Sequence, residues 1–109
     1  MFAIERYSKA HSVEDAVKLL AADPAAKLIA GGTDVLIRLH EGSQDFRCLV
    51  DINGLAALKA ITTEADGTVR IGCLATFSEI MDSDVVNQRV PVIAEAAATV
   101  GGPQLRNVA

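Results

Sequence analysis

The sequence predicts an α/β or α+β domain, and three observations support this class. Short apolar runs of strand length alternate with longer segments in which apolar residues recur at helical spacing. Turn-forming pairs that contain glycine, asparagine or aspartate separate these segments. Half of the residues are hydrophobic, which is enough to form a core. The length of 109 residues corresponds to one domain or to part of one.

The first two predicted elements are a strand and a helix. Residues 2–7 alternate loosely between apolar and polar, which predicts an edge strand. Ser12 is a good helix cap, because the acidic residue Asp15 follows three positions later. Apolar residues then recur at helical spacing until Asp23 and Pro24 end the helix.

The next stretch combines a strand, a glycine turn and the start of a helix. Residues 26–30 fit a short buried strand, and Val35 begins an apolar helical pattern. Gly31-Gly32 lets the chain reverse, and Thr33 or Asp34 is expected to cap the helix. Such a turn exposes unpaired amides that suit a phosphate. Glycine pairs are also common for purely structural reasons, so both interpretations remain open at this point.

The second half of the chain predicts a strand, a helical turn, a hairpin and two helices. Asp66-Gly67 is a hairpin signal, and Thr76 with Glu79 forms a second capping box. The remainder, Gly101 to Ala109, is expected to be a glycine-bearing loop that stops without a closing element. The predicted ranges are 48–52 for the strand, 55–58 for the turn, 60–64 and 68–72 for the hairpin, and 76–81 and 91–100 for the helices.

The composition excludes several classes of protein. The formal net charge is −4 with the signs interspersed, whereas nucleic-acid binding needs clustered lysine and arginine. No apolar run has the length of a membrane span, and the amino terminus lacks the plan of a signal peptide. Cys48 and Cys73 lie far apart without a Cys-x-x-Cys spacing. We therefore expect two reduced, buried thiols in a cytoplasmic protein.

Conventional catalytic side chains are few. His11 and His40 are distant in sequence and lie near predicted helix ends, which favours solvated surface histidines. No cluster of histidine, cysteine and carboxylate has metal-ligand spacing, and no serine lies in a glycine-flanked elbow. We predict neither catalytic residues nor a metal site. If the chain belongs to an enzyme, a cofactor supplies the reactivity.

Two segments, taken together, resemble the molybdenum hydroxylase flavoprotein family. Residues 27–36, Lys-Leu-Ile-Ala-Gly-Gly-Thr-Asp-Val-Leu, resemble the family's first FAD-binding segment, and residues 101–109 resemble the lead into its second, which continues as Thr-x-Gly-Gly-Asn. Similar pieces at residues 49–52, 69–72 and 75–80 lie between them in matching order and spacing. The run from residue 26 to residue 40 is most similar to the FAD-binding subunits of bacterial xanthine dehydrogenases.

This resemblance implies a fold and a set of cofactor contacts. The chain would be the N-terminal subdomain of a two-subdomain FAD-binding fold, with a small mixed sheet flanked by helices. Residues 1–109 would form the N-terminal part of the FAD-binding domain, without the rest of the second FAD loop and the C-terminal domain. Backbone amides would be the main donors to the FAD diphosphate. The implied cofactor-binding residues are Lys27, Leu28, Ile29, Ala30, Gly31, Gly32, Thr33, Asp34 and Ala109.

The resemblance also implies partners and a reaction. In the family, substrate is hydroxylated at molybdenum on a molybdopterin-binding subunit, and electrons pass through a [2Fe–2S] subunit to FAD and then to NAD. In a xanthine dehydrogenase this reaction oxidises purines. Since half of the diphosphate cradle would be missing, we expect the 109-residue chain alone to be inactive and to bind FAD weakly.

Two alternatives remain open. One is a flavin subunit of the same fold that serves an aldehyde or carbon monoxide dehydrogenase. The other is a non-enzymatic small α/β binding or interaction module, in which the glycine turns are purely structural.

Overall fold

The computed structural model describes residues 4–109 of the chain, and these residues divide into two compact units. The first unit ends at Leu55 and the second begins at Ala56. Helices and strands occur in both units, so the predicted α/β or α+β class is confirmed. The strands are distributed over two small sheets, one parallel and one antiparallel, and do not form one mixed sheet.

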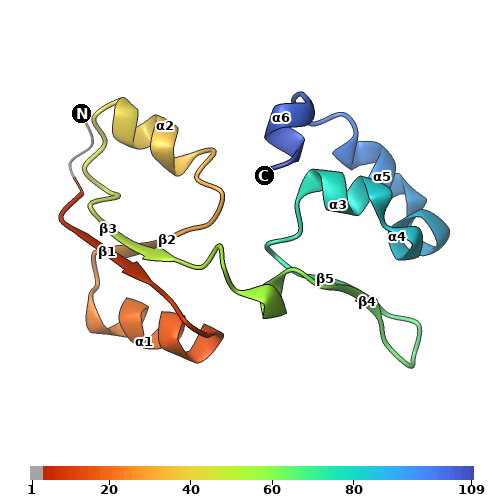
Figure 1. Cartoon of the computed structure of the whole chain (residues 1–109), viewed down its shortest axis with the longest axis horizontal. Coiled ribbons are helices and arrows are strands. Elements are labelled where there is room, and N and C mark those ends of the chain that lie inside the picture. Colours follow the sequence, from red (N-terminus) through yellow and green to blue (C-terminus); the bar gives the residue numbers. More distant parts are fainter. Residues whose placement is uncertain (1–3) are drawn as a thin grey trace. The chain divides into compact units, whose positions relative to one another are not determined.

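The first unit is a three-stranded parallel sheet that lies between two helices (Figure 1). The strand order is β1-β3-β2, so the last strand in the sequence occupies the centre. Along the chain the elements are β1 (Arg6–Lys9), α1 (Val13–Ala22), β2 (Ala26–Ile29), α2 (Val35–His40) and β3 (Cys48–Asp51).

The sheet register places the carboxyl ends of the three strands level with one another. Lys9 of β1 and Ile29 of β2 both lie opposite Asp51 of β3. The predicted first strand is an edge strand, as expected, but it begins at Arg6, later than predicted. The start of the predicted range, residues 2 and 3, lies outside the described residues.

The core of the first unit is built on the central strand. Cys48, Leu49 and Val50 are all buried, and such a continuous apolar run is typical of a parallel strand covered on both faces. Leu39 of α2 is 1% exposed, and Ala16 of α1 is also buried. Cys48 therefore confirms the expected buried thiol, whereas Cys73, in the second unit, is exposed and corrects that expectation.

The helix α1 begins as its sequence predicts. The hydroxyl of Ser12 accepts a hydrogen bond from the amide of Asp15 at 3.0 Å. The carboxylate of Asp15 in turn accepts a hydrogen bond from the amide of His11 at 2.9 Å. These bonds satisfy donors that the first turn of a helix leaves without partners.

The second unit combines a hairpin with short helices (Figure 1). The helix α5 packs against α3 and α4, and α4 also lies against the hairpin. The buried apolar side chains of the second unit are Leu74, Val86, Ala94 and Ala97. Its elements are the 3-10 turn η1 (Ala56–Leu58), β4 (Ile61–Thr63), β5 (Val69–Ile71), α3 (Phe77–Asp82), α4 (Asp84–Arg89), α5 (Pro91–Ala97) and α6 (Pro103–Arg106).

The second unit confirms some predicted elements and adds two. The hairpin and the capping box are present, with the Glu79 amide 3.2 Å from the Thr76 hydroxyl. The helices α4 and α6 were not predicted, and α5 ends at Ala97, earlier than expected. The prediction of a loop throughout residues 101–109 is therefore wrong. Helices of four and six residues contain too few turns to show a helical period in the sequence.

Candidate functional site

The carboxyl edge of the parallel sheet is the candidate site, because the predicted FAD-binding turn leaves the sheet there. Two backbone bonds join the three strand exits at this edge. The amide of Ala10 donates to the carbonyl of Asp51, and the amide of Ile52 donates to the carbonyl of Ile29, both at 3.0 Å. In open α/β sheets, ligands bind outside the carboxyl ends of the strands.

The backbone conformation at position 32 favours glycine. The φ of Gly32, 80°, lies in the left-handed region, which favours glycine. A side chain on its buried backbone would begin 3.0 Å from Cδ1 of Leu36 and 3.6 Å from Cδ1 of Ile29. The positive φ therefore favours glycine at this position, and a side chain there would also crowd Leu36, whichever ligand approaches the turn from solvent.

The expected cap on α2 is wrong. Asp34 occupies the capping position but makes no side-chain bond to the first turn, and Thr33 makes none either. A capping residue normally has an extended backbone, whereas Asp34 has helical angles, φ −101° and ψ −46°. Its carboxylate instead forms an ion pair with Nε of Arg38 at 3.2 Å.

The turn presents a row of amides without internal partners. Among residues 4–109, no backbone or side-chain acceptor receives the amides of Gly31, Gly32, Thr33 or Asp34. Neighbouring amides around a bend can converge on an anion. The turn therefore offers unpaired backbone amides, and not a side-chain cap, to the solvent at this edge.

The structure separates the predicted site residues into three groups. Residues 29–34 lie together at the carboxyl edge. Lys27 and Leu28 lie within β2, and the Lys27 side chain lines a pocket with Glu5, Gln44, Asp45 and Arg47. Ala109 belongs to the second unit, where its carbonyl accepts the amide of Phe77 at 2.8 Å.

The second glycine segment is fixed by an arginine that sequence reasoning missed. Nη1 of Arg106 donates to the carbonyls of Ala98, Val100 and Gly101 at 3.2, 3.3 and 2.9 Å. These carbonyls follow the end of α5 and lack partners from further helical turns. The sequence does contain a sign of this arrangement. Arg106 follows shortly after the Gly-Gly-Pro segment that ends a helix, and cationic side chains near a helix end often bind the carbonyls left without partners.

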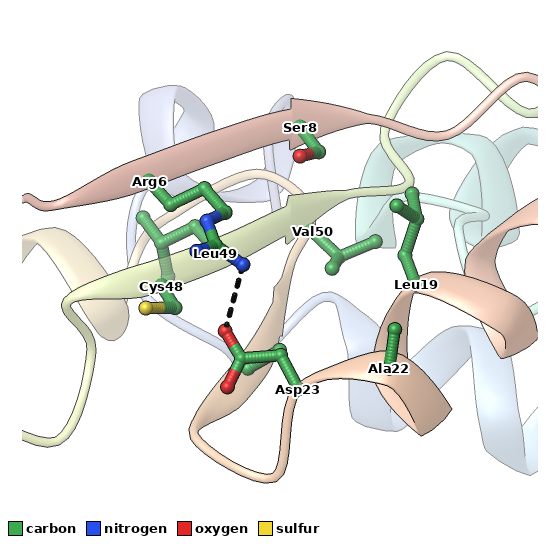
Figure 2. A pocket seen from close by; sticks show the side chains of 9 residues that line it. Arg6, Ser8, Leu19, Ala22, Asp23, Cys48, Leu49 and Val50 are labelled. Carbon is green, nitrogen blue, oxygen red and sulfur yellow. Dashed lines mark hydrogen bonds and ion pairs between the residues drawn. The ribbon is translucent and has the colours of Figure 1, made fainter.

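A small pocket on the α1 side of the sheet is not a cofactor site (Figure 2). Its volume is about 60 Å³, whereas pockets for cofactors usually measure about 300–1,000 Å³. Arg6 and Asp23 form an ion pair of 3.4 Å at the pocket. Cys48 also lines it, and burial, together with a hydrogen bond to Asp23, raises the pKa of its thiol.

The described residues offer neither a metal-binding cluster nor a membrane-spanning helix. No group of three or more histidine, cysteine, aspartate or glutamate side chains within residues 4–109 could hold a metal ion. None of the helices in the same range has the length and apolar character needed to cross a membrane.

Comparison with known proteins places this chain in a family. Residues 2–109 match the family described as the FAD binding domain in molybdopterin dehydrogenase. The xanthine dehydrogenase FAD-binding subunit of Escherichia coli O157:H7 is 45% identical over 109 residues, which is 100% of this chain and 37% of the relative. The carbon monoxide dehydrogenase medium chain of Hydrogenophaga pseudoflava is 36% identical over 93% of this chain and 35% of its own length.

Solved structures show the same fold. Carbon monoxide dehydrogenase from Hydrogenophaga pseudoflava matches 100% of this chain and 38% of its own chain, with a TM-score of 0.92 and 34% identity. Quinoline 2-oxidoreductase from Pseudomonas putida 86 matches 99% and 38%, with a TM-score of 0.89 and 28% identity. The chain thus spans less than two-fifths of these relatives. Its match from residue 2 to residue 109, together with the glycine turn at the sheet edge, shows that this chain belongs to the family of FAD-binding domains of molybdopterin dehydrogenases.

Proposed function

We propose that residues 1–109 form the N-terminal part of the FAD-binding subunit of a xanthine dehydrogenase. The observation that carries the proposal is the 45% identity to the Escherichia coli xanthine dehydrogenase FAD-binding subunit, which extends over the whole chain. The corresponding identity to the carbon monoxide dehydrogenase medium chain is 36%. Because both relatives are much longer, the complete activity is a proposal for the whole subunit.

The turn after β2 fits the phosphate portion of FAD. Gly31, Gly32, Thr33 and Asp34 present unpaired amides at the carboxyl edge of the sheet, and hydrogen bonds to a charged acceptor are the strong kind. Ile29 and Ala30 lead into this turn, and Ala109 would begin a second contact segment. Lys27 and Leu28 contribute through the strand that positions the turn.

The rest of the complex supplies the chemistry. FAD, when bound, provides the redox centre between the [2Fe–2S] clusters of one partner subunit and NAD as the acceptor. A molybdopterin-binding subunit would oxidise the purine. The name of the Hydrogenophaga relative, a medium chain, supports a complex of several subunits. A cytoplasmic location fits the two cysteines without paired spacing.

The test is purification of the complete flavin subunit with its molybdopterin and [2Fe–2S] partners. We expect one FAD per flavin subunit and reduction of NAD that depends on xanthine. Flavin content is measured from absorbance after denaturation, and turnover from the absorbance of NADH. A complex without flavin would contradict the proposal.

The second candidate is a flavin subunit of an aldehyde or carbon monoxide dehydrogenase. The 0.92 TM-score to carbon monoxide dehydrogenase favours it, because it shows that this fold also serves that substrate. A flavin-loaded complex that oxidises an aldehyde or carbon monoxide, but not xanthine, would establish this alternative.

A further inference from the structure

We propose that Lys9 contacts the phosphates of the flavin nucleotide and supplies the positive charge that the glycine turn itself lacks. This inference rests on the proposed function, because it concerns the same edge of the sheet. It adds a side chain on β1 to a site that was otherwise composed of β2 and the turn after it.

Lys9 lies at the same edge as the glycine turn. It is the last residue of β1 and lies level with Asp51, as does Ile29 on the far side of β3. Two strand spacings place the backbones of Lys9 and Ile29 about 10 Å apart. A lysine side chain and a diphosphate together can span such a gap.

The Lys9 side chain lies over the loop that follows β3. Its Cε is 3.3 Å, and its Nζ 3.7 Å, from the position that a side chain on Gly54 would occupy. Glycine at position 54 therefore leaves room for the end of the Lys9 side chain, chiefly for its Cε. This loop begins directly after Ile52, whose amide donates to the carbonyl of Ile29 at 3.0 Å.

The ammonium group of Lys9 has no carboxylate partner within residues 4–109. Its register neighbour Asp51 is already engaged, because one carboxylate oxygen accepts the Tyr7 hydroxyl and the other accepts the Asn53 amide. Arg38, on the helix that follows the glycine turn, is paired with Asp34. Lys27, at the amino end of β2, lines a pocket that contains Glu5 and Asp45.

The chemistry of a diphosphate explains why this placement matters. The group carries two negative charges, and amides from one turn reach it from one side only. An ammonium group on the other side of β3 would complete the ligation with a mobile point charge, which is the usual way in which lysine binds phosphate.

The test measures FAD affinity of the complete flavin subunit after removal and re-addition of the cofactor. We expect Lys9→Met to raise the FAD dissociation constant roughly tenfold and to reduce its dependence on NaCl concentration. Lys9→Arg should retain most of the affinity. Lys18→Met is the matched control, because Lys18 is an exposed lysine on α1 and its removal should leave the dissociation constant unchanged.

The outcomes separate this inference from the proposed function. If the wild-type subunit binds FAD and Lys9→Met binds it as tightly as Lys18→Met does, the role of Lys9 is wrong while the proposed function stands. If the wild-type subunit binds no FAD, both are wrong. A thermal unfolding curve of each apo-protein confirms that the affinity change is not a loss of folding.

Discussion

The two Gly-Gly turns of this protein have the same composition but different structural surroundings. In each, a glycine with positive φ, Gly32 at 80° or Gly101 at 54°, precedes a leucine by one helical turn. Gly32 is buried between a strand and a helix of the parallel sheet unit, whereas Gly101 is exposed between two helices. The first turn thus lies at the edge of the sheet between β2 and α2, and the second is stabilised by the bonds of Arg106.

This difference shows what a glycine pair can and cannot reveal. Arg106 uses its charge on carbonyls of its own chain, so the second turn has an internal cation. The first turn has four amides without an acceptor among residues 4–109. At the same edge of the sheet, Lys9 of β1 has no carboxylate partner in that range. The amides of Gly101 and Gly102 also lack an acceptor among residues 4–109, so the two turns differ in their neighbouring cation: Arg106 is bound to carbonyls of its own chain, whereas Lys9 is not paired with a carboxylate.

The largest expected effect is that of Gly32→Val in the flavin subunit. Valine at positive φ is strained, and its side chain would press against Leu36 and Ile29. We expect a loss of about 3 kcal/mol or more in the free energy of unfolding, together with loss of bound flavin. Urea denaturation and the ratio of flavin to protein absorbance measure the two effects.

Gly42→Val is the matched control for this prediction. Gly42 also has a positive φ, 91°, but nothing lies within 4 Å of the position that its side chain would take. This variant should show the backbone strain alone and keep its flavin. Equal losses in the two variants would mean that contact with Leu36 does not fix the first turn.

An intermediate effect is expected for Arg106→Met. The variant leaves three carbonyls at the end of α5 without their donor, which should lower the free energy of unfolding by about 1–3 kcal/mol. Arg89→Met removes an exposed arginine from α4 and should change stability by less than about 0.5 kcal/mol. If the two variants are equally stable, Arg106 does not stabilise the second turn.

The smallest effect is expected for Asp34→Ala. Asp34 makes only an exposed ion pair with Arg38, and such pairs contribute about 0–1 kcal/mol. Ser12→Ala removes a real helix cap and should cost about 1 kcal/mol. Chemical denaturation of both variants tests the ranking, and a larger loss for Asp34→Ala than for Ser12→Ala would contradict it.

The sequence predicted elements well where a local rule determines them. The Ser12 cap, the Thr76 capping box and the hairpin depend on residues close in sequence, and all are present. The absence of a cap at Asp34 was not predictable, because it depends on the backbone angles of the turn, although its pairing with Arg38 follows the usual four-residue spacing of helical ion pairs. The position of Lys9 at the carboxyl edge depends on the pairing of β1 with β3, which are distant in sequence. The cofactor contacts of residues 27–34 and of Ala109 stay predictions.

The central position of β3 has a consequence for protein synthesis. In the parallel sheet, β1 and β2 pair only with β3 and never with each other. Both strands must therefore wait, without a ladder partner, until Cys48 to Asp51 have left the ribosome. Contacts between distant residues form late because closing a long loop costs entropy. The nascent glycine turn consequently acquires its fixed place only when residues beyond it, at the centre of the sheet, have been translated.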